Sequence, residues 1–411
     1  MTNSKLGILQ NTNAFIVFIS QLLSTICDKM MSIGLVWYLT THYSINVVPW
    51  FLAVSFLPHI FMSFFSSTII NRHGILKTVI ATEYFRGLVL VLLFTSMFFV
   101  TEGTKPFLFC LFIAAFLIGI GSSVFNPAIL SLPPSLVETE EVPALNALLD
   151  TSFSISNILG AACSIFLLNL FDIKVLVMIN AISFFVAAVL QTRVKMKAAK
   201  EEAIAETSTQ DAEGAMQILK RYPSIKRMLI SFLFINLIFT PILVMIPWYV
   251  DNVFNGTGRD LAVIEGAMGF GAFLMGMLLS VSAVKVREEK RIGMIAIVCF
   301  LFGLFFQVFS FSKNTSEASF LLFLIGLLST FLNVQVLTYF QTALKEHEVP
   351  AIMVAVNIIS AATMPLSFAI SGLLFPIVDI PRFALICGLL TMLIAFFLPS
   401  FLKTKPHEGS V

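Results

Sequence analysis

Glu141-Val142-Pro143-Ala144 recurs 207 positions later as Glu348-Val349-Pro350-Ala351, and the similarity extends into the apolar segments on both sides. Further matches at this offset pair Gly119 with Gly326, Asn126 with Asn333 and Asp150 with Asn357. At an offset of 211, Trp37-Tyr38 corresponds to Trp248-Tyr249. Several matches in register indicate that the chain consists of two related halves. A parallel repeat of this size is typical of transporters in which one half rocks against the other.

The composition predicts an all-α membrane protein. Hydrophobic residues make up 58% of the chain, charged residues only 12%, and phenylalanine supplies 43 of 411 residues. Continuous apolar runs of about 18 to 25 residues can cross a bilayer as helices, whereas barrel strands would alternate. We place twelve such transmembrane helices, six in each half, near residues 14–40, 48–70, 78–100, 107–131, 145–169, 173–192, 228–250, 261–284, 292–311, 318–342, 351–376 and 382–402.

The distribution of basic residues predicts the orientation, because Lys and Arg near the ends of spans are retained on the cytoplasmic side. With the N-terminus inside, 19 of the 25 basic residues lie in or beside cytoplasmic segments. We therefore expect both termini in the cytoplasm and a multi-pass protein of the cell inner (cytoplasmic) membrane. The asymmetry of charge belongs to this topology, and it gives no reason to expect a nucleic acid partner.

Three parts follow from the polar stretch in the middle of the chain. We predict an N-terminal six-helix bundle at residues 1–192, a cytoplasmic linker at 193–227, and a C-terminal six-helix bundle with a short cytoplasmic tail at 228–411. The first apolar run is too long for a cleaved signal peptide and leads directly into the second span. We expect the protein to work as a monomer.

Cofactor and metal chemistry are not indicated. The five cysteines are scattered through apolar spans, which suggests neither a disulfide framework nor a metal cluster; they are Cys27, Cys110, Cys163, Cys299 and Cys387. No phosphate-binding loop of the GxxxxGK[ST] type occurs. We therefore expect a carrier rather than an enzyme, without a cofactor, whose energy comes from an ion or substrate gradient.

Polar residues within spans identify the helices that line a pathway, because such residues avoid lipid. Spans one, four, five, seven, ten and eleven carry polar stripes at helical spacing, whereas spans three, six, nine and twelve look peripheral and lipid-facing. A central cavity is implied. Its candidate lining residues, which could alternatively make ordinary interhelical hydrogen bonds, are Gln21, Ser24, Asn126, Asp150, Asn157, Asn236, Asn333 and Asn357.

Asp28 and Lys29, half-way through the first span, give the sharpest local signal. Each charge at that depth costs about 2.5–3.5 kcal/mol on insertion scales. Successive side chains on a helix point about 100° apart, so one of the two should reach the pathway while the other pairs with a neighbouring helix. The second half has Phe239 and Thr240 at these positions. We therefore predict that Asp28 is a coupling or cation site and that Lys29 is its counter-charge or a substrate contact.

Other titratable residues are weaker candidates. Glu83 and Arg86 lie three residues apart, which favours a local ion pair or a gating contact. Asp150 could pair with Lys29 or with the inner loops. Glu265 and His59 are possible proton sites, although a snorkelling carboxylate and a packed imidazole are the plainer interpretations.

The chain resembles the major facilitator superfamily over nearly its whole length, and within it the branch of macrolide efflux pumps and enterobactin-type siderophore exporters. The residues that carry this resemblance are Leu35-Val36-Trp37-Tyr38-Leu39, Asn126-Pro127-Ala128, Leu145-Asn146-Ala147-Leu148 and the segment 219–227. The stretch Gln21-Leu22-Leu23-Ser24 with Asp28 is also similar to bacterial lysophospholipid flippases.

Two motifs depart from the superfamily pattern. The loop between spans two and three normally reads GxLxDRxGRR, but here only Asn71-Arg72, Gly74 and Lys77 remain, so Arg72 is a gating candidate without the usual acid. Gly160-Ala161 stands where antiporters commonly have Gly-Pro. The resemblance thus implies the fold firmly and proton antiport only weakly.

The sequence predicts a secondary active transporter that works by alternating access and exports amphipathic small molecules, of the drug or siderophore class, coupled to an ion such as the proton. The alternative within the same superfamily is a lysophospholipid or lipid flippase, in which Lys29 would bind a phosphate head. A sensor that binds ligand without moving it is disfavoured by the lack of a signalling domain. The expected partners are therefore a small amphipathic substrate, a proton or other ion, and membrane lipid.

Overall fold

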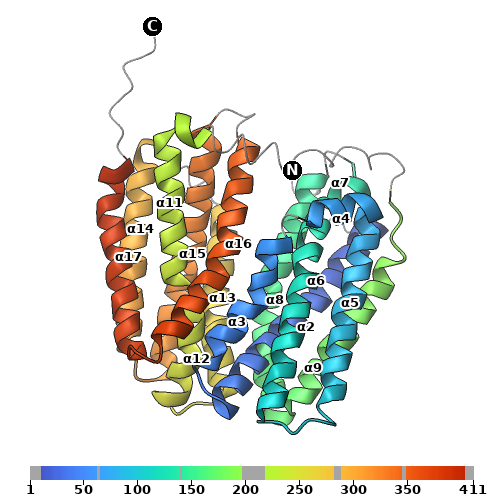
Figure 1. The fold of residues 1–411 in the computed structure, drawn as a ribbon. Helices are drawn as coiled ribbons and strands as arrows, with labels where there is room; N and C mark the ends of the chain where they lie inside the picture. The colour runs from blue at the N-terminus through green and yellow to red at the C-terminus, as the bar shows by residue number, and fades with distance from the viewer. Residues whose placement is uncertain are drawn as a thin grey trace. The chain divides into compact units, whose positions relative to one another are not determined.

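The computed structural model describes residues 11–62, 65–138, 141–196, 218–281, 288–344 and 349–402, and these residues form α-helices without a β-strand. Much of the predicted linker, at residues 197–217, lies outside the described residues. The chain divides into two compact units, Met1–Glu206 with Gly256–Gly266, and Thr207–Asn255 with Ala267–Val411. Each unit is a bundle of helices (Figure 1).

The first unit contains eight helices among its described residues. They are α2 (Thr12–His42), α3 (Val47–Met62), α4 (Ser66–His73), α5 (Ile75–Ser96), α6 (Lys105–Ser131), α7 (Pro133–Leu136), α8 (Val142–Leu170) and α9 (Ile173–Gln191). The turn between α4 and α5 depends on Gly74, whose φ of 83° lies in a region that side chains with a Cβ rarely adopt. The start of α13, as far as Gly266, also belongs to this unit.

The second unit repeats this arrangement. Its described helices are α11 (Pro223–Phe239), α12 (Ile242–Asn252), the remainder of α13 (Gly258–Val281), α14 (Glu288–Phe309), α15 (Thr315–Thr342), α16 (Val349–Leu374) and α17 (Ile380–Leu402). The pairs α5 with α9, α5 with α6 and α2 with α8 pack together in the first unit. The corresponding pairs α14 with α17, α14 with α15 and α11 with α16 pack together in the second.

Glycines permit close contact at equivalent crossings in the two units. A Cβ atom placed on Gly119 would lie 2.2 Å from the backbone oxygen of Ser55 in α3. One placed on Gly326, which the repeat pairs with Gly119, would lie 2.1 Å from the backbone oxygen of Met268 in α13. These glycines are therefore required by helix packing. The same holds for Gly271, where a Cβ would lie 2.1 Å from the oxygen of Phe323.

The seventh predicted span is interrupted, which the sequence analysis did not anticipate. We expected one continuous helix at 228–250, but α11 ends at Phe239 and α12 begins at Ile242, with Pro241 between them. Proline lacks the N–H group that would continue the helical ladder, and its ring clashes with the preceding turn. The interruption falls at the position that corresponds to Lys29 and Met30 in α2. The two units therefore differ in backbone as well as in charge at this depth.

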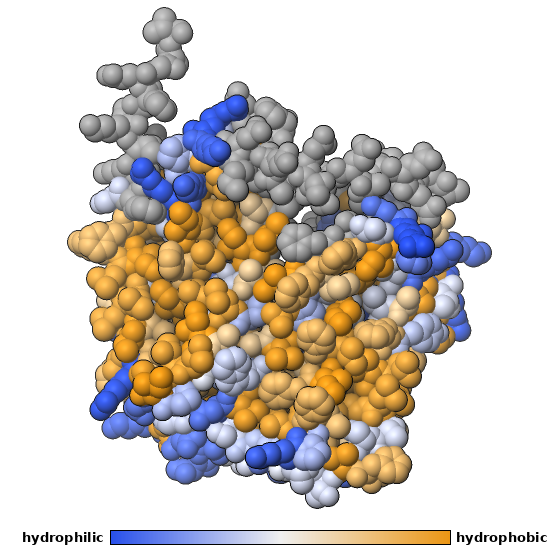
Figure 2. Space-filling view, in the orientation of Figure 1, coloured by the Kyte–Doolittle hydropathy of each residue, from blue (hydrophilic) through white to orange (hydrophobic). Residues whose placement is uncertain are grey.

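Nine stretches of the described residues are long and apolar enough to cross a membrane, and three shorter apolar helices lie at Val47–Met62, Ile155–Ser164 and Ile358–Leu374. The number of twelve spans and the cytoplasmic position of both termini remain predictions. On the face drawn in Figure 2, hydrophobic side chains cover the middle of the helices, and hydrophilic side chains gather near their ends. The protein is a multi-pass membrane protein.

Candidate functional site

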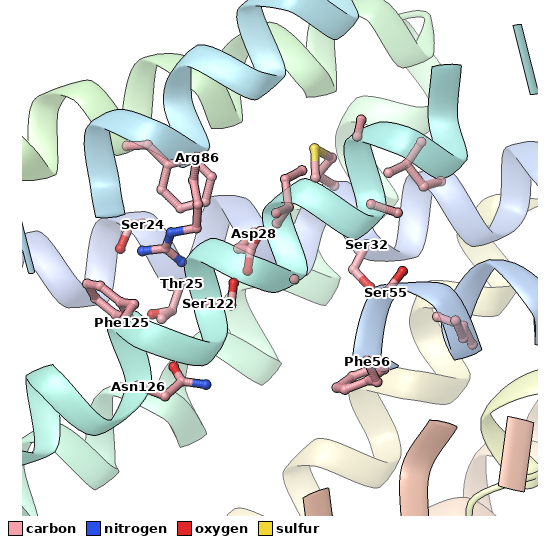
Figure 3. A pocket seen from close by; sticks show the side chains of 18 of the residues that line it. Ser24, Thr25, Asp28, Ser32, Ser55, Phe56, Arg86, Ser122, Phe125 and Asn126 are labelled. Atoms are coloured by element: carbon pink, nitrogen blue, oxygen red, sulfur yellow. The ribbon is translucent and has the colours of Figure 1, made fainter. Parts of the chain in front are cut away.

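A cavity of about 330 Å³ lies inside the first unit. Its walls come from α2, α3, α5 and α6, with one phenylalanine each from α8 and α9. Figure 3 shows Ser24 and Asp28 on one helix, Arg86 reaching toward them from a second, and Phe125 and Asn126 on a third. Apolar side chains dominate the lining, and the titratable groups among the described lining residues are Asp28, His59 and Arg86.

Asp28 faces this cavity and is held by a hydrogen bond from α9. The Nδ2 group of Asn180 donates to Asp28 Oδ1 at 3.2 Å, and the Asn180 side chain is fully buried. Ser183, one turn further along α9, donates to the oxygens of Asn180 at 2.8 and 3.2 Å. This second contact fixes the amide so that its NH₂ group points at the carboxyl group. Asp28 is therefore positioned by a polar pair that the sequence analysis did not identify.

Arg86 and Glu83 form the ion pair that their spacing predicted. Arg86 Nη2 lies 2.8 Å from Glu83 Oε2, and the two side chains are 6% and 0% exposed. The guanidinium carbon also lies 4.1 Å from the ring centroid of Phe125 and 4.4 Å from that of Phe184. Stacking of a guanidinium between aromatic faces is favourable. The side chain is thus held by a carboxylate and by two rings at the edge of the cavity.

Spans three and six, which the sequence predicts to be peripheral and lipid-facing, each turn one face toward the cavity. Arg86 of α5 and Phe184 of α9 line the cavity, and Asn180 of α9 bonds Asp28. The opposite faces fit the prediction, because each presents exposed apolar residues such as Leu92 on α5 and Ile182 on α9. A helix with few polar residues can therefore still supply one critical contact to the interior.

Lys29 pairs with Glu265, and it is not among the lining residues of the cavity. Lys29 Nζ lies 2.7 Å from Glu265 Oε2, with the side chains 29% and 8% exposed, and both residues belong to the first unit. The sequence predicts Lys29 as the counter-charge of Asp28 or as a substrate contact, with Asp150 as another possible partner, and a Glu265 side chain that reaches water; the observed partner, Glu265, is none of these. The burial of Glu265 overturns the expectation that its side chain reaches water. Close packing supports the pair, because a Cβ on Gly160 would lie 2.7 Å from Lys29 Cβ.

Several other predicted residues lie at the cavity. Gln21, Ser24, Asn126 and His59 are all among its lining residues. Gln21 is 1% exposed, and its Oε1 atom has no hydrogen-bond partner among the described residues. His59 Nδ1 is likewise buried and without such a partner. These unpaired polar atoms supply hydrogen-bonding capacity that a bound molecule could satisfy.

The remaining predicted residues are placed differently. Asn236 donates to the backbone oxygen of Phe232 at 2.8 Å, and Asn333 donates to that of Ser329 at 3.1 Å, so each amide bonds within its own helix. Asn157 and Arg72 are exposed and are not lining residues of this cavity. The side chains of Asp150 and Asn357 lie outside the described ones.

Comparison with known proteins identifies the family. The sequence profile of the Major Facilitator Superfamily matches residues 17–368. Macrolide efflux protein A of Streptococcus pyogenes is 20% identical over 393 residues, which cover 94% of this chain and 95% of that protein. A putative bacilysin exporter of Bacillus subtilis is 25% identical over 278 residues, covering 65% of this chain and 66% of that protein.

The fold is shared with solved transporters. The crystal structure of a bacterial homologue of the iron transporter ferroportin, in an inward-facing state, superposes with a TM-score of 0.74. The match covers 95% of this chain and 98% of that one at 12% identity, so it supports the fold alone. The profile match, the internal repeat and the paired helical bundles all agree. This chain belongs to the Major Facilitator Superfamily of membrane transporters.

Proposed function

We propose that the protein is a secondary active transporter that exports neutral or cationic amphipathic small molecules in exchange for protons, by alternating access. The observation that carries the proposal is the charge balance of a cluster at the edge of the cavity, with His59 neutral: Asp28 and Arg86 line the cavity, and Glu83 forms an ion pair with Arg86 outside the lining. Asp28 and Glu83 supply two carboxyl groups, Arg86 supplies one cation, and Lys29 is engaged by Glu265. The cavity cluster therefore has one negative charge in excess when both carboxyl groups are ionised.

An uncompensated charge in a largely apolar cavity is unfavourable. Either a proton or a cationic substrate neutralises the cluster, and the two are then mutually exclusive ligands of one site. Such competition is the basis of exchange transport, because the site crosses between the two sides of the membrane with either a proton or a substrate bound. Asp28 is the better candidate for this role, because Glu83 already lies 2.8 Å from Arg86.

The lining supports an amphipathic substrate. Aromatic rings, including Phe51, Phe56 and Phe153, surround the few polar groups, and this mixture is typical of small-molecule sites. The names of the relatives, a macrolide efflux protein and a putative bacilysin exporter, support export. The site fits an anionic lipid head group less well, because Lys29 and Arg86 each already have a carboxylate partner.

The test is a flux measurement with the purified protein in liposomes. A cationic amphipath, its neutral analogue, its anionic analogue and a lysophospholipid are compared with and without a pH gradient. We expect gradient-driven movement of the cationic and neutral compounds that stops when an ionophore collapses the gradient. Protein-free liposomes give the background. Movement confined to the lysophospholipid, or flux unaffected by collapse of the gradient, would contradict the proposal.

A further inference from the structure

A second cavity lies in the first unit where α4 and α5 meet α6. Its volume is about 570 Å³, and its lining includes Met62, Phe85, Ile120 and Val124. Arg72, His73 and Lys77 also belong to the lining, and the same three residues line an adjoining polar cavity of about 220 Å³ around Gly74. A cationic pocket thus opens directly into an apolar groove.

The groove runs along one face of α5. Lys77, Ala81 and Phe85 are spaced four residues apart, so they lie on the same side of the helix. Phe85 is about 12 Å deeper along the axis than Lys77, at about 1.5 Å per residue. Exposed apolar residues continue the same face to Leu88 and Leu92. The basic end of the groove is therefore followed by an apolar stretch, in the same order as the charged head group and the acyl chains of a phospholipid.

The basic residues of this pocket are available to a ligand. Arg72 and Lys77 are exposed, and neither has a carboxylate oxygen within 4.0 Å among the described residues. His73 is exposed, and the printed contact of its ring, 3.1 Å to the backbone oxygen of Ile69, uses Nδ1 alone. The lining residues of the two cavities include no Asp or Glu. The charge in this region is therefore positive and without a counter-charge of its own.

We propose that this is a binding site for an anionic phospholipid of the surrounding membrane. The phosphate contacts Arg72, His73 and Lys77, and an acyl chain lies in the groove between α5 and α6. Basic pockets between transmembrane helices on the cytoplasmic side bind such head groups, and the charge distribution predicts that this end of α5 is cytoplasmic. The loop segment at residues 71–77 contains no Asp or Glu that would repel an anion.

The lipid site shares a wall with the transport cavity. Gly121 lines the groove, and a Cβ atom placed there would lie 2.7 Å from Arg86 Cγ and 3.2 Å from Phe85 Cδ1. An acyl chain in the groove would therefore pack against the backbone that supports Arg86. This contact offers a route by which the lipid composition of the membrane acts on the site.

The experiment measures phospholipid retained by the whole protein released from nanodiscs, by native mass spectrometry. Nanodiscs contain phosphatidylglycerol and phosphatidylcholine with identical acyl chains. A basic residue near a membrane surface contributes about fivefold to the affinity for anionic lipid. The double variant Arg72→Gln/Lys77→Gln should therefore bind phosphatidylglycerol roughly 30-fold more weakly. The matched control is Lys220→Gln/Lys226→Gln, which removes the same charge from the same predicted side of the membrane and should change binding less than threefold.

A second variant and a competitor separate a lipid from a simple anion. Ala81→Phe fills the groove without touching the basic residues, and it should weaken retention of phosphatidylglycerol. Inorganic phosphate in large excess should not displace the lipid. The proposal is overturned if the Arg72→Gln/Lys77→Gln variant retains as much phosphatidylglycerol as wild type, or if the control variant loses as much of this lipid as the Arg72→Gln/Lys77→Gln variant does. It is also overturned if Ala81→Phe leaves retention unchanged, or if inorganic phosphate displaces the lipid.

Discussion

Replacement of Arg86 by methionine tests the buried charge cluster, because Met keeps contact with the flanking rings while it removes the charge. Glu83 is 0% exposed and would lose the cation that lies 2.8 Å away. Removing one partner of a buried pair costs about 3–5 kcal/mol, mainly because the other charge is left without compensation. The rings of Phe125 and Phe184 limit any further loss, since sulfur packs well against aromatic side chains.

The assay is a double-mutant cycle on the free energy of unfolding in mixed micelles. Arg86→Met and Glu83→Gln should each destabilise the protein by about 3–5 kcal/mol, and the double variant should lose much less than the sum. We expect a coupling energy near the upper end of about 0.5–3 kcal/mol for interacting residues. Additive losses would show that the two charges do not compensate each other, and would refute the charge balance from which Asp28 was assigned.

A partly exposed ion pair in the same unit is the control for this cycle. Lys174 Nζ lies 2.6 Å from Glu102 Oε1, but these side chains are 32% and 26% exposed. An ion pair that water can reach contributes little to stability, because solvent screens the two charges. The cycle of Lys174→Met with Glu102→Gln should therefore give a much smaller coupling energy than the cycle of Arg86→Met with Glu83→Gln. A coupling energy as large as that of Arg86 and Glu83 would show that burial is not what makes an ion pair in this protein strong.

Two further predictions concern packing and the second ion pair. Gly271→Ala should destabilise the protein by about 1–3 kcal/mol, because the new Cβ would meet a backbone oxygen. Gly276→Ala should leave stability unchanged, because no atom lies within 4 Å of the Cβ at that position. Equal thermal stability of the two variants would contradict this. Lys29→Ala should lose transport activity and stability, and Glu265→Gln in the same protein should restore part of both. The double-mutant cycle should give a coupling energy of about 0.5–3 kcal/mol between the two residues. Independent effects of the two substitutions would show that the 2.7 Å contact does not hold Lys29.

The repeat and the apolar runs made the two-bundle fold predictable, because hydrophobicity and internal similarity are properties of the sequence itself. The repeat also made Gly119 and Gly326 equivalent positions, whereas the close helix contacts at both came from the structure. The interruption at Pro241 was harder to foresee, since proline is often tolerated inside a transmembrane helix. Whether it bends or ends the helix depends on neighbouring groups that satisfy the freed backbone.

The contacts of the candidate site were only partly predictable. Helical geometry required Asp28 and Lys29 to point in different directions, but the neighbouring sequence does not indicate which residues they contact. Asn180 and Glu265 lie 152 and 236 positions away from these residues, on helices whose rotation is set by packing. The signal for Asn180 was present as an amide with Ser183 one turn later in an otherwise apolar span. Pairing such isolated polar residues with unpaired charges elsewhere could have found it.

The central claim is that Asp28 couples substrate movement to proton movement, and proton flux measured together with substrate flux tests it most directly. The protein is placed in liposomes that contain a pH-sensitive dye, and Asp28→Asn is compared with wild type. The substituted amide keeps an oxygen that accepts from Asn180, so the fold should survive. With wild type, substrate addition should move protons, and each unit of pH gradient should support up to about tenfold accumulation for one proton exchanged. The Asp28→Asn variant should still exchange labelled for unlabelled neutral substrate, which does not need the lost charge, but should move no protons. Proton movement by this variant at the wild-type ratio to substrate would contradict the account.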